Sequence, residues 1–237
     1  MNKRLGVSLL LVSALAGGTL AQAAPQTVHT EIKNMNALSQ QQQALIPIAA
    51  FAATGDMDAL RQALNAGLNQ GLTINEIKSL LVQVYAYAGF PRSLNALNTF
   101  MAVLDERQSQ GINDAEGKSS QALPAAYDAL AQGSDNQTKL VGQPVTGALF
   151  DFAPEIDTYL KAHLFGDIFA QDVLSWQARE IATVSMLAAM TGTDSQLKSH
   201  VNISKNIGIT TEQLQAIEQV LNDKVSKDVS QKLTDAF

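Results

Sequence analysis

The chain has 237 residues, with 22 acidic and 16 basic side chains and a formal net charge of −6, a balance that argues against nucleic acid or an anionic membrane as partner. It contains no cysteine, which excludes disulfide bonds and any mechanism that needs a thiol. Its three histidines are His29, His163 and His200, too few to favour a three-histidine zinc site.

The N-terminus has the pattern of a secretory signal peptide. Lys3 and Arg4 precede an apolar run over residues 5–16, and Ala21-Gln22-Ala23 follows as a cleavage site. The run is shorter than the roughly 20 residues that a membrane-spanning helix needs. We therefore expect residues 1–23 to be cleaved after Ala23 and the mature protein to be periplasmic or secreted. Its net charge would be −8, because the leader carries two basic residues and no acidic one.

Residues 24–37 are polar and are predicted to form a flexible arm. Helical periodicity begins at Leu38, and the first helix is expected to end before Gly55. A second helix extends to about Asn69, where Gly71 suits the left-handed position that ends a helix.

The segment Thr73-Ile74-Asn75-Glu76 is a capping box that predicts the start of a third helix, which would end near Gly89. A fourth helix is expected from about Pro91 to Arg107, since proline is well tolerated in a first helical turn. Residues 38–107 therefore form the first helical unit.

Residues 108–137 are rich in Gln, Ser, Gly, Asp and Asn, which predicts a linker with one short helix near 123–130. In the second unit, residues 138–237, helices are expected over 176–190 and 194–206 with a break at Gly192, and a second capping box begins at Thr210. No alternating pattern indicates a strand, so the predicted fold class is all-α, a helical bundle.

The two units are copies of each other. Residues 52–77 align without a gap with residues 189–214 at an offset of 137, and eight of the 26 positions are identical. That is more than two unrelated amphipathic helices would share, so the chain carries a tandem repeat. The identical residues are Ala52, Thr54, Gly55, Leu60, Asn65, Asn69, Gly71 and Thr73, which reappear as Ala189, Thr191, Gly192, Leu197, Asn202, Asn206, Gly208 and Thr210.

The copies differ in the residues that could carry chemistry. In the alignment of the two repeats, His200 of the second corresponds to Ala63 of the first, and Glu180 corresponds to Gln43 or Ala44. Conversely, only the first repeat has an aromatic turn, which contains Tyr85, Tyr87, Gly89 and Pro91. The second repeat has Asn222, Lys224, Ser226 and Asp228 at the aligned positions.

Glu180 and His200 lie on consecutive helices that must run antiparallel, because only the short break at Gly192 joins them. At about 1.5 Å rise per residue the two differ in height by about 6 Å, which long side chains can close. A carboxylate beside an imidazole fixes its tautomer and suits it to act as a general acid or base. Alternatively, Glu180 pairs with Arg179 or Lys198 at the surface and His200 is a packing residue.

Several segments resemble the carboxymuconolactone decarboxylase family, which is related to the alkylhydroperoxidase D-like proteins. In the second repeat they are Phe165-Gly166-Asp167-Ile168-Phe169, Leu174-Ser175 followed by Arg179-Glu180-Ile181-Ala182, and His200-Val201-Asn202 followed by Asn206-Ile207-Gly208-Ile209-Thr210. In the first they are residues 64–73 and Gln83-Val84-Tyr85-Ala86-Tyr87-Ala88-Gly89-Phe90-Pro91. The resemblance covers about residues 38–106 and 145–221.

The resemblance implies an alkylhydroperoxidase D-like helical bundle and oligomers with threefold symmetry, so that a two-copy chain could form a trimer. It implies a proton relay in which Glu180 and His200 are the catalytic pair. A small-molecule substrate, a carboxylated lactone or similar enolisable acid, would be decarboxylated without a cofactor. Arg179 or Arg92 would bind an acid group of the substrate.

The family's tyrosine turn and its histidine lie on different copies here, so we expect a composite site in which Tyr85, Tyr87 and Phe90 form the wall. At least one of the two tyrosines is expected to be a core residue, because positions i and i+2 point to different sides of a helix. Peroxidase chemistry is disfavoured, since no cysteine precedes His200. The competing hypothesis is an exported binding or assembly protein that kept the bundle without catalysis.

Overall fold

The computed structural model describes residues 37–237, and within that range it contains helices and no strand, which confirms the all-α prediction. The predicted signal peptide and nearly all of the predicted arm fall on residues 1–36, outside the described part. No helix in residues 37–237 combines the length and the apolar character needed to cross a bilayer.

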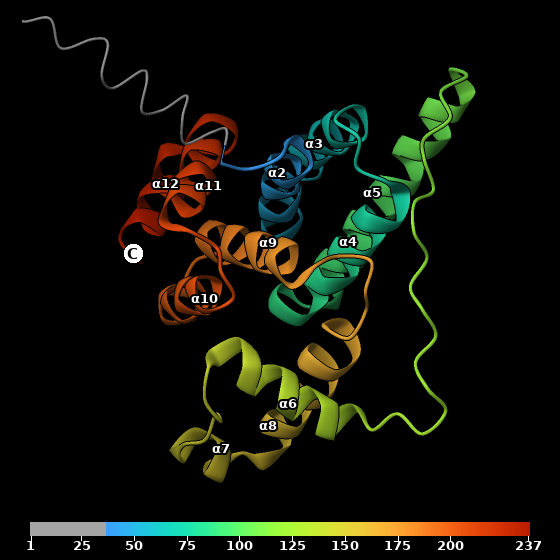
Figure 1. Cartoon of the computed structure of the whole chain (residues 1–237). Helices are drawn as coiled ribbons and strands as arrows, with labels where there is room; N and C mark the ends of the chain where they lie inside the picture. Colours follow the sequence, from blue (N-terminus) through green and yellow to red (C-terminus); the bar gives the residue numbers. More distant parts are fainter. Residues whose placement is uncertain (1–36) are drawn as a thin grey trace, which may run out of the picture.

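Each repeat is built from four consecutive helices (Figure 1). The first repeat consists of α2 (Gln40–Thr54), α3 (Met57–Asn69), α4 (Ile74–Ala88) and α5 (Phe90–Ser109). The second consists of α9 (Trp176–Ala189), α10 (Asp194–Asn206), α11 (Thr211–Lys224) and α12 (Lys227–Thr234). Between them lie α6 (Ala129–Val141), the short helices α7 (Ala148–Phe152) and α8 (Pro154–Tyr159), and the π-helix η1 (Leu160–Ile168).

The helix ends follow the local signals in the sequence. Both predicted capping boxes are formed, with Thr73 paired to Glu76 at the start of α4 and Thr210 paired to Gln213 at the start of α11. Gly71 and Gly208 have φ values of 90° and 91°, a left-handed conformation that favours glycine. The repeated glycines therefore set the turn that leads into the third helix of each copy.

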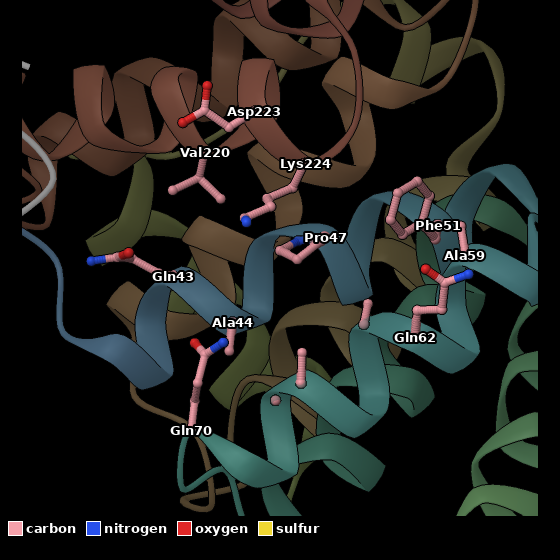
Figure 2. Close-up of a pocket in the computed structure, with 13 residues that line it drawn as sticks. Gln43, Ala44, Pro47, Phe51, Ala59, Gln62, Gln70, Val220, Asp223 and Lys224 are labelled. Carbon is pink, nitrogen blue, oxygen red and sulfur yellow. The ribbon is translucent and has the colours of Figure 1, made fainter.

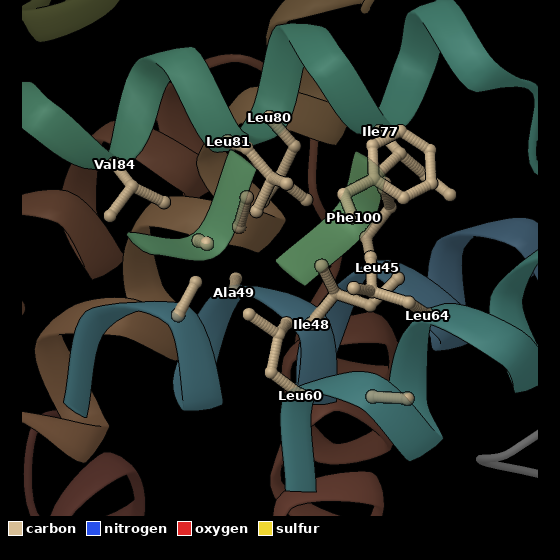
Figure 3. Close-up of a cluster of buried hydrophobic side chains, with 14 of the residues drawn as sticks. Leu45, Ile48, Ala49, Leu60, Leu64, Ile77, Leu80, Leu81, Val84 and Phe100 are labelled. Atoms are coloured by element: carbon tan, nitrogen blue, oxygen red, sulfur yellow. The ribbon is translucent and has the colours of Figure 1, made fainter. Parts of the chain in front are cut away.

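Helices α2 and α9 pack against each other at the centre of the molecule, and each is buried in both repeats (Figure 1). On α2, Leu45 and Ile48 belong to the core of the first repeat (Figure 3), whereas Ile46 and Ala50 belong to the core of the second. On α9, Met186 reaches into the first core. A helix that is apolar on all sides is suited to such a central position. The two repeats thus share one continuous interior.

The linker differs from the prediction in the position of its helix. Residues 112–128 form an extended segment along one side of the molecule (Figure 1), and the helix expected near 123–130 begins only at Ala129, where Asp128 caps it. The resulting α6 crosses the expected boundary at residue 137. Backbone carbonyls of Ala115 and Glu116 accept hydrogen bonds from the first amides of α4, so the extended segment is attached to the first repeat.

Helices α6 and η1 form a pair, and residues 37–237 contain no second pair of this kind beside the first repeat. Their backbones approach closely at two glycines: a Cβ on Gly133 would lie 1.8 Å from the carbonyl oxygen of Lys161, and a Cβ on Gly166 would lie 2.2 Å from that of Ala129. The pair is fixed to α10 by Asn206, whose side-chain amide donates to the carbonyl of Leu140 at 2.8 Å. It covers one face of the second repeat.

Candidate functional site

Helices α9 and α10 bring Glu180 and His200 together. The two helices are antiparallel neighbours joined by the turn at Gly192, which has a φ of 74°. Oε2 of Glu180 lies 2.8 Å from Nδ1 of His200, within hydrogen-bond distance. Glu180 is fully buried and His200 is 9% exposed, so the pair lies inside the bundle rather than on its surface. The surface pairing of Glu180 with Arg179 or Lys198 is not formed.

Tyr87 of the first repeat completes this cluster. Its ring meets the imidazole of His200 edge to face, with centroids 5.6 Å apart and an interplanar angle of 75°. Burial raises the pKa of the Tyr87 phenol, and the negative charge of Glu180 raises it further. The cluster therefore combines a neutral phenol from one copy with the histidine of the other, and Tyr87 is the one of the three expected wall residues that contacts His200.

Several buried polar atoms around this cluster have no hydrogen-bond partner among the described residues. They are the hydroxyl of Tyr87, Oε1 of Glu180, Nε of Arg179 and the hydroxyl of Ser204, which lies one turn beyond His200. Thr183 lies close to Tyr87, but its hydroxyl is committed to the carbonyl of Arg179 and to the amide of Gln83. An unpaired buried polar atom costs about 1–3 kcal/mol. Such atoms gathered around an ionisable pair indicate a functional site more than a stabilising one.

Arg179 points away from His200, toward α4 and the end of η1. Its guanidinium donates to Oε1 of Gln83 at 3.0 Å, to the hydroxyl of Ser79 at 3.1 Å and to the carbonyl of Gln171 at 3.0 Å. No carboxylate among the described residues pairs with it. Burial lowers the pKa of Arg179 to about 10. A buried cation held only by neutral acceptors can accept an anionic ligand.

Tyr85 and Phe90 stack on each other on the opposite side of α4 from Tyr87. Their ring centroids are 4.6 Å apart and the planes differ by 11°. Together with Tyr159 and His163 they line a cavity of about 410 Å³. The same Tyr85 and His163 border a second cavity of about 480 Å³ that reaches Arg179. These expected wall residues thus form a groove of their own, separate from the Tyr87 cluster.

Arg92 is not part of either group. Its guanidinium lies directly over Gly55, so that a Cβ built on that glycine would come within 1.4 Å of Nη1. His163 pairs with Asp167 at 2.9 Å, and both side chains are largely exposed. No group of three histidine, aspartate or glutamate side chains in residues 37–237 is arranged to hold a metal ion.

The residues that sequence reasoning missed are the polar ones inside the helices. Gln83 is fully buried and bonds both Arg179 and Thr183. A glutamine inside the apolar run Leu80-Leu81-Val82-Gln83-Val84 is a signal that could have identified it, because an unpaired amide would not be buried there. Ser204 gave no such signal, since serine is common on half-exposed helices.

The model of the carboxymuconolactone decarboxylase family matches residues 19–100 and 154–221, which together are more than half of the chain. A 4-carboxymuconolactone decarboxylase of Acinetobacter baylyi is 35% identical over 68 residues, covering 29% of this chain and 51% of that protein. An uncharacterised protein of Methanocaldococcus jannaschii is 29% identical over 77 residues, covering 32% of this chain and 72% of that protein.

The aligned segment thus spans about half the length of the Acinetobacter decarboxylase. The two matched regions correspond to the two repeats, as the internal alignment predicted. The chain belongs to the carboxymuconolactone decarboxylase family.

Proposed function

We propose that this protein is an exported, cofactor-independent lyase that decarboxylates a small carboxylated lactone or a similar enolisable acid. The observation that carries this proposal is the 2.8 Å contact between Glu180 and His200 inside the bundle. Since Glu180 occupies Nδ1, the nitrogen that can exchange a proton with a substrate is Nε2. Among the described residues, Nε2 has no hydrogen-bond partner.

In the proposed reaction the bond between a ring carbon of the substrate and its carboxylate carbon breaks, and carbon dioxide leaves. The electron pair moves into the conjugated system that ends at the lactone carbonyl, which gives a dienolate. The imidazolium of His200 then donates its Nε2 proton to a carbon of the dienolate. The neutral imidazole of His200 regains a proton from water. Glu180 holds the ring and stabilises its protonated form during this cycle.

Arg179 is the better candidate for binding an acid group of the substrate. It lacks a carboxylate partner among the described residues and borders a cavity of about 480 Å³, whereas Arg92 is placed over Gly55. Tyr87 connects the two regions, since it packs on His200 and its pKa also responds to the charge of Arg179. Access to His200 requires displacement of α6 and η1, because their side chains pack against Tyr87 and α10.

The proposal is tested with purified mature protein and a carboxymuconolactone as substrate. We expect His200→Gln to abolish turnover, because the amide can still donate to Glu180 but cannot transfer a proton. Lys198→Gln is the matched control, since it changes an exposed residue of the same helix two positions before His200. Turnover that survives His200→Gln, or that is lost in Lys198→Gln instead, would show that the relay is not the Glu180–His200 pair.

A non-catalytic exported binding or assembly protein is the second candidate. It is favoured by the enclosure of the pair: Glu180 and His200 line none of the cavities of about 340 to 490 Å³ that lie between α2 and α3, beside α12 or around Tyr85. In that case wild-type protein and His200→Gln would be equally inactive toward every carboxylated lactone tried, while small acids would still bind.

We also propose that the chain assembles into a trimer. Large apolar side chains are exposed on α5, α7 and α8, among them Phe90, Leu94, Leu149 and Phe152, which is 88% exposed. Exposed apolar surface of this kind is typical of protein interfaces. Light scattering should give three times the chain mass, and Phe152→Asp should reduce it. A monomeric wild-type protein would contradict the trimer.

A further inference from the structure

A cavity of about 490 Å³ lies between α2 and α3 of the first repeat and α11 of the second (Figure 2). Its floor is apolar and is formed by Ala44, Pro47 and Phe51 of α2 and by Ala63 of α3, with Ala66 at the rim. Val220 and Lys224 of α11 form the opposite wall. Pockets that bind small molecules have volumes of about 300–1,000 Å³, with mostly apolar walls and a few polar groups. This cavity fits both criteria.

The cavity occupies the position that the Glu180–His200 cluster has in the second repeat. With the offset of 137 residues, Ala63 corresponds to His200, Ala66 to Ile203 and Lys224 to Tyr87. At each of the two positions on α3, the first repeat has the smaller side chain. The space that the imidazole and the isoleucine fill in one copy is therefore open in the other.

A second difference keeps the cavity open. In the second repeat, Ile203 packs with Leu140 of α6 and Phe165 of η1, and Tyr87 packs against the same cluster. At the offset of 137 residues, the positions equivalent to η1 precede residue 32 and lie outside the described residues. Among residues 37–237, no helix pair packs on the equivalent face of α3 and α11 as α6 and η1 pack on the second repeat.

Two charged side chains line the cavity, Lys224 and Asp223. Among the described residues the ammonium group of Lys224 has no hydrogen bond and no ion pair, and Figure 2 shows the side chain directed toward Pro47. No ion pair joins Lys224 to Asp223, whose Oδ1 accepts from the amides of Gln219 and Asn222 and whose carboxylate is directed away from Lys224 in Figure 2. An apolar pocket with one available cation at its wall selects an organic anion.

We propose that this cavity is a second ligand site, which binds a small carboxylic acid with its carboxylate on Lys224 and its apolar body against Pro47, Phe51 and Ala63. The site binds without turnover, since an alanine stands where the second repeat has its histidine. It is independent of the proposed lyase function, because it uses none of the residues of the Glu180–His200 cluster.

The test uses benzoate as the probe and benzamide as its uncharged isostere, with titration calorimetry on the mature wild-type protein. We expect benzoate to bind and benzamide to bind at least tenfold more weakly, a difference of about 1.4 kcal/mol. Lys224→Met should remove this preference, and Lys224→Arg should restore it. Lys227→Met, which changes an exposed lysine three residues further along the chain, should leave benzoate affinity unchanged.

A second variant fills the cavity without touching its charge. Ala66 is exposed at the rim, so Ala66→Phe should be tolerated by the fold and should abolish benzoate binding. His200→Gln should bind benzoate as the wild type does. The proposal is overturned if the wild type does not bind benzoate, if Lys224→Met and Ala66→Phe bind it normally, or if binding is lost in His200→Gln. A change of oligomer mass in Ala66→Phe would instead identify this face as a subunit interface and would also overturn it.

Discussion

Oε2 of Glu180 and Nδ1 of His200 lie 2.8 Å apart across α9 and α10, with the glutamate fully buried. Removing one partner of a buried pair costs about 3–5 kcal/mol, whereas replacing both with apolar residues is often neutral. We therefore expect His200→Leu to lower the free energy of unfolding by about 3 kcal/mol. The double variant with Glu180→Leu should recover most of that loss. Urea denaturation of the single and double variants measures the coupling, and simple additivity would contradict it.

The exposed pair His163–Asp167 serves as the control for that cycle. Its atoms are 2.9 Å apart, yet the side chains are 61% and 45% exposed. Exposed pairs contribute at most about 1 kcal/mol, so His163→Leu should change stability little. The two pairs have nearly equal distances, so a larger loss of stability in His200→Leu than in His163→Leu would be due to burial.

Arg179 and Arg107 are both buried arginines with opposite environments. Arg107 is paired with Asp114 by two hydrogen bonds, at 2.8 and 2.7 Å, whereas Arg179 has neutral acceptors only. Arg107→Met should cost about 3 kcal/mol because it leaves a buried carboxylate unpaired. Arg179→Met should cost less, about 1–2 kcal/mol, because the fully buried acceptor that it leaves without a donor is only the neutral amide oxygen of Gln83. Thermal unfolding of both variants checks this. Turnover should fall in Arg179→Met alone, and a large loss of stability there would make Arg179 a structural residue.

The sequence predicted the second repeat well because its signals are local. Caps and glycines define where α9 and α10 end, and counting residues from Gly192 gives the relative height of Glu180 and His200. The comparison of the two repeats identified the candidate functional residue, because the first copy has no histidine at the position of His200. These inferences need no knowledge of how distant segments pack.

The directions of the side chains around α4 follow from the sequence only in part. The sequence predicts that Tyr85 and Tyr87 point to different sides of the helix and that at least one is a core residue, but the packing of distant segments determines that Tyr87 is the one beside His200. Arg179 and Arg92 were equal candidates, and only packing against Gln83 and Gly55 distinguishes them. The position of α6 was also missed, because the contact of Gly133 with η1 is made by residues far apart in the chain.

Asp172 makes the attachment of the extended segment pH-dependent. Lys118 approaches its carboxylate to 2.5 Å and the amide of Gln121 donates to it at 3.2 Å, and these contacts hold the pKa of Asp172 below its usual range. A carboxyl group with a lowered pKa in the folded state stabilises above its unfolded pKa, and the contribution is lost as the pH falls through the folded value. We expect proteolysis within residues 112–128 to accelerate below about pH 4.

Asp172→Asn should produce the same fast proteolysis at neutral pH, since it removes the charge without changing the size of the side chain. Asp151→Asn is the control, because Asp151 lies on the exposed surface of α7 with no ion pair among the described residues. Equal cleavage rates for wild type and Asp172→Asn at pH 7 would show that the ion pair does not hold the segment.

The close approach of α6 and η1 at Gly133 should determine how closely these two helices pack on the second repeat. In Gly133→Ala the new Cβ would lie 1.8 Å from the carbonyl oxygen of Lys161, so the two backbones must separate. Trp176 is the only tryptophan and its indole donates to the carbonyl of Phe169 at the end of η1, so its fluorescence reports on this separation. We expect a red shift and a lower melting temperature, because water reaches the ring when the pair moves. Ser134→Ala, on the same helix, should show neither change. Unaltered fluorescence in Gly133→Ala would mean that α6 shifts alone and that η1 does not follow it.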